Sequence, residues 1–460
     1  MSWRIRFMTA GAAVALLGGT AAMAQDAPSA RTPAAAATTR HLTIQEAVQL
    51  ALQHNHVVKI AGYKVEESLH AKEKARSGYF PQIKNETNVL KVTDTQFIQI
   101  AAGELGTING SPNPDHSVTI NQGGKTFVTS GTGLVQPITP LFTKVKPAND
   151  VARANLDATR ASAQETTNEI ALKVHELYYQ LLIAQSHHGA VEARIAAAQE
   201  LQNQRTQEVK YGSTLREDLI ESTARTLQAK QELLSTELEL ADLTLELNDA
   251  IGLPLNTRLD LDPNVPQVPA SCEPEACIKA ALESHPEILE ARDEVRKAAA
   301  AHQLSKADYI PDLSAFARYT YANDVPFLAR NFGTFGVSFT YDIFDGGRRR
   351  AEVRESDSRL AQAKENLARV TEEVEVRVQT ASNKLDRTRE MMKVSEELLA
   401  LRVESRRTSA QELAQGSALK AQADAAAAQE LEAQTMLLQS QLDYIGAHDE
   451  LIQAIGRTPE

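Results

Sequence analysis

The chain has 460 residues, of which 23% are charged and only 5% are aromatic, and its 60 acidic residues outnumber 48 basic ones for a net charge of −12. The length alone would allow about three compact domains. However, scarce Gly, Pro and aromatic residues are typical of long helices. The acidic balance excludes nucleic acid as a partner, because phosphate binding needs a basic face.

The first 24 residues have the pattern of a secretory signal peptide. Two arginines precede an apolar stretch, 7–18, that is too short to span a bilayer, and Ala22-Met23-Ala24 fits a cleavage site. We therefore expect an exported protein that begins with a disordered tail, 25–41, rich in Pro, Ala and Thr. No later stretch reaches 18 consecutive apolar residues, so any membrane-spanning part must consist of strands.

Landmarks in the first half of the chain recur in the second half. Tyr79-Phe80-Pro81 returns 230 residues later as Tyr309-Ile310-Pro311, whereas Gly212 returns 204 residues later as Gly416. The difference of 26 residues places an insertion in the first copy. The stretch 94–124 is rich in Gly, Asn, Ser and Pro and is interpreted as a long loop. The sequence thus predicts a duplicated helix–strand–strand–helix–helix unit.

The predicted elements follow in chain order. The first repeat, 42–257, contains helices 43–79, 146–210 and 215–251 and strands at about 82–93 and 126–137. A linker, 258–273, leads to the second repeat, 274–457, with helices 274–308, 348–411 and 417–455 and strands 313–322 and 332–344. Pro81 ends the first helix, because the residue before a proline is pushed out of the helical region. In the long helices, apolar residues spaced alternately by four and three predict coiled-coil packing.

The predicted strands carry most of the aromatic residues. In the strand 332–344, Phe335, Val337, Phe339 and Tyr341 alternate with small or polar residues, as in an outer-membrane strand. A half-buried strand of a soluble sheet alternates in the same way. Four strands cannot close a membrane barrel, so the barrel would have to be shared between chains: two chains give eight strands and three give twelve.

No catalytic motif is present, and neither a metal site nor a cofactor is predicted. His187 and His188 are adjacent, so they do not share a helix face. Cys272 and Cys277 are the only cysteines, and in an exported protein an even number indicates pairing. We predict a small local disulfide between them.

Several motifs together resemble the TolC-like outer-membrane efflux family. They are Leu42-Thr43-Ile44-Gln45-Glu46-Ala47-Val48, its echo Ala281-Leu282-x-x-His285-Pro286-Glu287-Ile288, then Gln136-Pro137-Ile138 and Phe344-Asp345-Gly346-Gly347-Arg348. The likeness covers about residues 42–457. It implies a mainly α-helical protein with a membrane β-barrel contribution: a homotrimer with a 12-stranded β-barrel on a 12-helix periplasmic α-barrel.

The resemblance also implies a function. Such a protein is the outer-membrane exit duct of a tripartite efflux or type I secretion system, a passive conduit in contact with outer-membrane lipid. Its partners are a periplasmic adaptor protein and an inner-membrane transporter. The alternative is a periplasmic coiled-coil adaptor or scaffold, which would lack strands of alternating aromatic residues.

The resemblance places functional residues at the two helix–helix turns. The tips that dock the adaptor are Lys210, Tyr211, Gly212, Ser213, Thr214 and Leu215, and Gln415, Gly416, Ser417, Ala418 and Leu419. Family channels have an acidic gate residue six positions after the turn glycine, where this chain has Asp218 in the first copy and Gln422 in the second, with Asp424 as the nearest acid. A purely structural interpretation also stands, since Thr214-x-x-Glu217 fits a helix-capping box and Asp218 complements the helix dipole.

Overall fold

The computed structural model describes residues 39–91, 97–121, 126–264, 272–323, 325 and 328–459. The predicted signal peptide, 1–24, lies outside the described residues, as do 25–38 of the predicted tail and 265–271 of the linker. The expectation of disorder up to residue 41 is wrong at its end, because Thr39–Leu42 form strand β1. This strand pairs in parallel with β8 (Arg258–Leu261), and Leu42 lies opposite Leu261, both buried.

The helices form two similar sets. The first set is α1 (Ile44–His54), α2 (His56–Ser77), α3 (Lys146–Lys210) and α4 (Arg216–Ile251), with a π-helical turn, η1 (Leu141–Val145), leading into α3. The second set is α5 (Pro274–Ser284), α6 (Pro286–Ala307), α7 (Arg348–Ala414) and α8 (Lys420–Ala454).

The predicted helices 43–79 and 274–308 are each broken in two, which corrects the sequence interpretation. The breaks fall at Asn55 and His285, whose backbones are extended with ψ of 131° and 128°. Each side chain caps the following helix: the Val57 amide donates to Asn55 Oδ1 at 2.8 Å, and the Glu287 amide donates to His285 Nδ1 at 3.2 Å. An Asn at the first break and Pro286 after the second were the available signals.

One four-stranded antiparallel sheet joins the two halves. Its order is β10-β9-β7-β2, from β2 (Gln82–Lys91), β7 (Thr126–Pro137), β9 (Asp312–Asn323) and β10 (Asn331–Thr340). The central pair, β7 and β9, takes one strand from each half. The strand predicted for 332–344 ends earlier, at Thr340, because the chain then turns through Gly346 and Gly347, both with positive φ, into α7.

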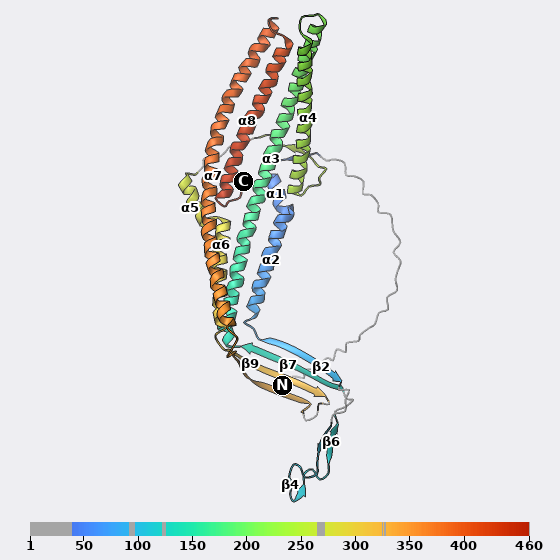
Figure 1. The fold of residues 1–460 in the computed structure, drawn as a ribbon, viewed down its shortest axis with the longest axis vertical. Helices are drawn as coiled ribbons and strands as arrows, with labels where there is room; N and C mark the ends of the chain where they lie inside the picture. Colours follow the sequence, from blue (N-terminus) through green and yellow to red (C-terminus); the bar gives the residue numbers. More distant parts are fainter. Residues whose placement is uncertain are drawn as a thin grey trace, which may run out of the picture. The chain divides into compact units, whose positions relative to one another are not determined.

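The stretch 94–124, expected to be a loop, carries short strands in its described part. β3 (Phe97–Ile100) pairs with β6 (Val118–Asn121), and β4 (Thr107–Ile108) pairs with β5 (Ser111–Pro112). These two pairs form separate small sheets and lie in a narrow arm beyond the end of the four-stranded sheet (Figure 1). The sequence did not predict this pairing, because the paired residues are about 20 positions apart along the chain and are separated by polar turn residues.

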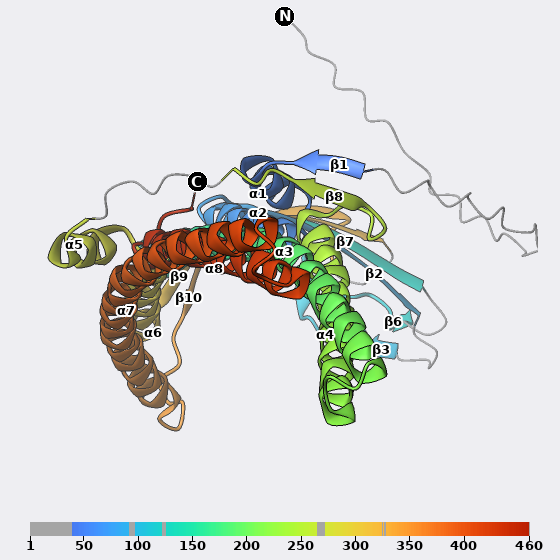
Figure 2. The same cartoon turned by 90° about the horizontal axis from the view of Figure 1, so that it is seen from above.

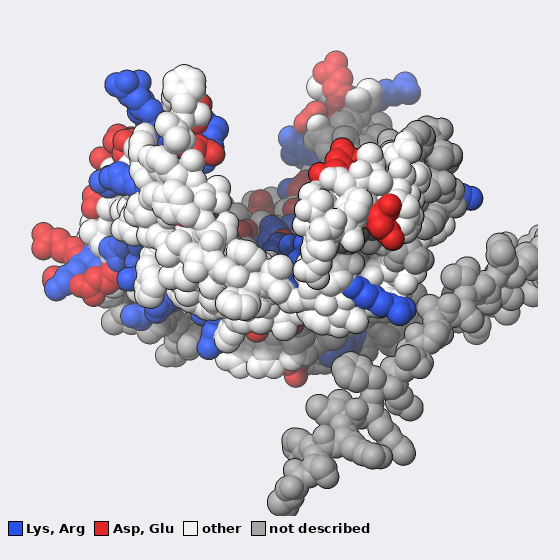
Figure 3. Space-filling view, turned by 90° about the horizontal axis from the view of Figure 1, so that it is seen from below, with Lys and Arg blue, Asp and Glu red and all other residues white. Residues whose placement is uncertain are grey.

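Within the described chain from residue 39 onward, the helices and the sheet lie at opposite ends. The α3–α4 and α7–α8 turns point away from the sheet (Figure 1), and seen along the helices, α7, α8, α3 and α4 follow a curve with α7 and α4 at its two ends (Figure 2). Seen from the strand end, this part is hollowed on one side, and charged side chains are visible in the hollow (Figure 3). No helix in the described ranges is long and apolar enough to cross a membrane.

The core consists of two clusters, one in each half. The first includes Val174, Leu247 and Ile251, and the second includes the residues 204 positions later, Val378, Leu451 and Ile455. Each of these side chains is at most 5% exposed. Burying one such aliphatic side chain stabilises the fold by about 1.5–3 kcal/mol, so apolar packing around α3 and α7 holds the helices together.

Candidate functional site

The α3–α4 tip is built on one glycine. Gly212 has φ of +71°, a conformation that costs a residue with a side chain about 1–2 kcal/mol. The turn is then closed by the Ser213 amide, which donates to the Glu208 carbonyl at 2.9 Å, and by the Ser213 hydroxyl, which donates to the same carbonyl at 2.9 Å. Two donors therefore satisfy a helix-end carbonyl, as in a Schellman motif.

The α7–α8 tip repeats this geometry. Gly416 has φ of +73°, and the amide and hydroxyl of Ser417 donate to the Glu412 carbonyl at 2.9 and 3.0 Å. Most of the predicted tip residues are exposed, and only Thr214 and Ala418 are half-buried. The tips thus present two similar rigid turns, whose small residues leave the backbone accessible.

Asp218 and Gln422, the residues predicted to form the gate, cap the first turns of α4 and α8. Asp218 Oδ2 accepts from the Thr214 hydroxyl at 2.6 Å and from the Leu215 amide at 3.3 Å, and these bonds lower the pKa of Asp218 below its ordinary value. Gln422 Oε1 accepts from the Leu419 amide in the same way at 3.3 Å. The capping box expected from Thr214 and Glu217 is therefore displaced by one residue.

The two tips share a groove that sequence reasoning missed. Its volume is about 520 Å³, and its lining includes Tyr211 and Ser213 from one turn and Leu419 and Lys420 from the other. Lys420 Nζ pairs with Glu200 on α3 at 3.3 Å, which ties the second hairpin to the first. No sequence signal links Glu200 with Lys420, because they are 220 positions apart along the chain. Asp424 lies further along α8 and is half-buried.

The two cysteines lie far from the tips along the chain, at the start of α5. The structure joins Cys272 and Cys277 by a disulfide, with their Cα atoms 5.8 Å apart. Cys277 is fully buried in the second core cluster, whereas Cys272 is exposed. The bridge therefore fastens the end of the linker to the core of the second half.

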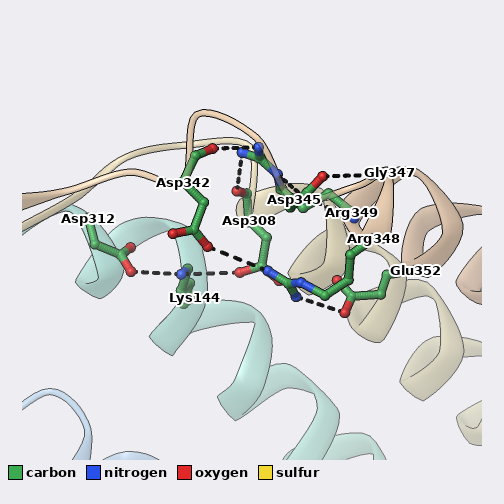
Figure 4. A network of polar contacts seen from close by, with 9 residues as sticks. All are labelled: Lys144, Asp308, Asp312, Asp342, Asp345, Gly347, Arg348, Arg349 and Glu352. Atoms are coloured by element: carbon green, nitrogen blue, oxygen red, sulfur yellow. Dashed lines mark hydrogen bonds and ion pairs between the residues drawn. The ribbon is translucent and has the colours of Figure 1, made fainter.

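A polar network holds the helices to the sheet (Figure 4). Lys144, in η1, pairs with Asp308 at 3.1 Å and with Asp312, at the start of β9, at 2.9 Å. Burial opposes the charge of Lys144, but the two carboxylates outweigh it and raise the pKa of Lys144. Because Lys144 belongs to the first half and both aspartates belong to the second, this contact fixes the two halves to each other.

Arg349 anchors the other side of the network. Its Nε donates to Asp345 Oδ2 at 2.6 Å and its Nη2 donates to the Asp342 carbonyl at 2.6 Å, while its guanidinium lies 5.4 and 5.1 Å from the ring centres of Tyr309 and Tyr341. Hydrogen bonds from Arg349 lower the pKa of Asp345 to about 2. The network therefore fixes the direction in which the chain leaves the sheet and enters α7 (Figure 4).

Comparisons with known proteins agree with this geometry. The family model described as "Outer membrane efflux protein" matches residues 277–457. No curated protein matches the sequence. Among solved structures, the Campylobacter jejuni CmeC outer membrane channel is 14% identical with a TM-score of 0.72, over 90% of this chain and 85% of that one.

Two further structures share the fold. The outer membrane protein VceC from Vibrio cholerae is 14% identical with a TM-score of 0.71, over 91% of this chain and 97% of that one. The Neisseria gonorrhoeae MtrE outer membrane channel, solved in its open state, is 15% identical with a TM-score of 0.67, over 90% and 89%. The arrangement of long helical hairpins on a small antiparallel sheet is therefore the fold of outer-membrane channels.

The family match and this fold confirm the resemblance that the sequence motifs indicated. Residues 277–457 match the outer membrane efflux protein family, and the described chain has the fold of TolC-like outer-membrane channels, which indicates a protein of the outer membrane with a large periplasmic helical part. It serves as an exit duct, and since proteins of this family are passive conduits, it is not an enzyme.

Proposed function

We propose that the duct is a homotrimer in which three four-stranded sheets close one twelve-stranded barrel. The observation that carries this proposal is the pair of sheet edges, β2 and β10, each ten residues long. The two edges run antiparallel, so β2 of one protomer can pair with β10 of the next. Closure matters because each unpaired backbone group in hydrocarbon costs several kcal/mol.

The outer helices support the same closure. On α4, Ile220, Leu227 and Leu234 recur every seven residues and are 61–66% exposed. On α7, Val394 and Leu401 are also seven apart and are 66% and 70% exposed. These two helices lie at opposite ends of the curve in Figure 2. Exposed heptad seams favour coiled-coil pairing, so α4 of one protomer packs on α7 of the next to form a twelve-helix tunnel.

Native mass spectrometry in detergent tests the trimer. We expect a species of three protomers. A stable monomeric form in the membrane would refute the shared barrel, because its two sheet edges would remain open.

We further propose that the tips dock a periplasmic adaptor protein, which connects the duct to an inner-membrane transporter in a tripartite efflux or type I secretion system. The exposed turns at Gly212 and Gly416 and the groove between them support this role, since small residues allow a partner helix to approach closely. In the trimer, three Asp218 carboxylates would gather near the tunnel end and act as a periplasmic gate. Gln422 adds no charge, and Asp424 is the nearest acid of the second hairpin.

Substitutions at the tips test the docking. Gly212→Glu and Ser417→Arg place bulky charges on the turns, so we expect export with the cognate adaptor to be lost while trimers still reach the outer membrane. Gly189→Ala is the matched control, because Gly189 lies in the middle of α3 with no atom within 4 Å of an added Cβ. Normal export by both tip variants would show that the turns only end the helices.

A further inference from the structure

The two faces of the four-stranded sheet differ in polarity most clearly along β10, where apolar residues alternate with small or polar ones. Phe335, Val337 and Phe339 of β10 are 88%, 64% and 68% exposed on the apolar face. Lys84 of β2 and Arg318 of β9 stand on the other face by strand alternation. A charged side chain in hydrocarbon costs about 2–4 kcal/mol. In the proposed barrel, on which this inference rests, the polar face therefore lines the bore.

On this polar face, one row of residues crosses all four strands. Lys84 lies opposite Gly133, Gly133 opposite Arg318, and Arg318 opposite Thr334. Two strand spacings separate Lys84 from Arg318, which is about 10 Å. Because Gly133 between them has no side chain, the two cations flank a shallow trough of bare backbone.

A second glycine determines where the Arg318 guanidinium lies. A Cβ added at Gly131 would come within 2.6 Å of Arg318 Nε and Nη2, so the guanidinium lies across β7 over this glycine. Arg318 Nη2 is 3.8 Å from Glu86 Oε2, which is beyond hydrogen-bond distance. Lys84, Glu86, Gly131, Gly133 and Arg318 all line one cavity of about 600 Å³.

The cavity has more positive than negative charge. Lys84 makes no ion pair with any residue that the structure describes, and the Arg318 side chain is 47% exposed. Guanidinium and ammonium groups bind carboxylates, phosphates and sulfonates through charge-assisted hydrogen bonds. Two cations beside a trough, opposed by the single carboxylate of Glu86, are suited to hold such a group.

We propose that Lys84 and Arg318 form an anion-binding subsite on the wall of the bore, present once per protomer. By threefold symmetry the three subsites lie at one height and form a cationic ring that anionic solutes meet on their way out. The two glycines keep the ring open, because they let Arg318 lie flat instead of pointing into the bore.

Charge-selective thiol labelling of trimers in outer-membrane vesicles tests the subsite. Thr334→Cys places a reporter in the same row, and the two native cysteines do not compete because they form a disulfide. The probes are the anionic sulfonatoethyl and the cationic trimethylammonioethyl methanethiosulfonates. Each nearby cation changes a reagent's local concentration by about threefold in water. Replacing Lys84 and Arg318 together by Gln should therefore lower the anionic-to-cationic rate ratio by at least about fivefold.

Lys91→Gln is the control for loss of a β2 lysine outside this row, since Lys91 lies on β2 on the apolar side of the sheet; it removes one of the two charges that the double variant removes. A rate ratio that is the same with and without Lys84 and Arg318 would overturn the subsite and leave the barrel intact. A second reporter, Phe335→Cys, tests the barrel itself, because Phe335 follows Thr334 on β10 and stands on the opposite face of the sheet. Equal labelling of Phe335→Cys and Thr334→Cys in membranes would show that water reaches both faces equally. That result would overturn the proposed barrel.

Gly131→Ala gives an independent test. The atoms that a new methyl group would meet belong to the end of a flexible side chain, so the fold should tolerate the change while Arg318 moves into the bore. We expect slower labelling of Thr334→Cys by both reagents, with the preference for the anionic reagent kept. Unchanged rates would contradict the position assigned to Arg318.

Discussion

A buried cluster between α3 and α8 gives the sharpest test of how the helices are held together. Asp449 of α8 is 6% exposed, and His175 of α3 is 1% exposed. His175 Nδ1 donates to Asp449 Oδ2 at 2.7 Å, and the Tyr179 hydroxyl donates to the same oxygen at 3.2 Å. Removing the carboxylate leaves two buried donors on α3 without their acceptor.

The expected loss follows from this geometry. A buried donor left without an acceptor costs about 1–3 kcal/mol, so Asp449→Ala, which leaves two such donors, should lower the free energy of unfolding by about 2–6 kcal/mol. Asp449→Asn keeps an oxygen acceptor but loses the charge, and hydrogen bonds to a charged group contribute about 1.5–3 kcal/mol each. We therefore expect a smaller loss, about 1.5–3 kcal/mol, for the Asn variant.

The pH dependence has a definite sign. Burial raises the pKa of Asp449, but hydrogen bonds from His175, His448 and Tyr179 outweigh it, so the pKa of Asp449 is lower in the folded protein than its ordinary value. A depressed pKa contributes stability that is present above the unfolded pKa of about 3.9 and is lost as the pH falls through the folded value. The difference between wild type and Asp449→Asn should therefore be fully present at pH 7, begin to shrink below about pH 4, and vanish only below the folded pKa of Asp449.

Guanidinium denaturation of the detergent-solubilised protein, followed by circular dichroism of the helices, measures these differences. Glu450→Ala is the neighbouring control: Glu450 pairs with Lys384 at the surface, where an ion pair contributes about 0–1 kcal/mol. If Asp449→Ala shifts the unfolding midpoint no more than Glu450→Ala does, the buried cluster does not hold α3 to α8 and the reasoning fails.

Two further predictions concern the backbone and the linker. Gly252→Ala should destabilise the first half by at least about 1–2 kcal/mol, because φ at Gly252 is +72° and a new Cβ would lie 2.6 Å from His54 Cβ. Gly189→Ala, in the middle of a helix, should instead stabilise α3 by about 0.5–1 kcal/mol. Thermal unfolding measures both, and equal midpoints for the two variants would contradict the predicted backbone strain at Gly252. Denatured, unreduced protein should show no free thiol at Cys272 or Cys277 on alkylation and mass spectrometry, and reducing the bridge should cost no more than about 2–3 kcal/mol because the loop is short; labelling of both cysteines would refute the pairing.

Features that depend on local chemistry could be predicted from the sequence. Pro81 stops a helix through its own ring, and Gly212 and Gly416 adopt a positive φ at little cost because they lack a Cβ. Alternation along β10 separates an apolar from a polar face without any knowledge of neighbouring strands. These signals, together with the order of the family motifs, were sufficient to predict the class of protein.

Features that join distant residues were decided by the tertiary structure alone. The Asn55 side chain, which caps α2 locally, also donates to the carbonyl of Ala250, 195 residues away, at 3.0 Å. Lys144 meets Asp308 and Asp312 only because the sheet brings the end of β7 beside the start of β9. Hydrogen bonds and ion pairs between distant residues leave no periodic pattern in the sequence. A residue that caps a helix or forms an ion pair cannot be distinguished in the sequence from one that is solvated. Only the folded chain brings its partner into contact with it.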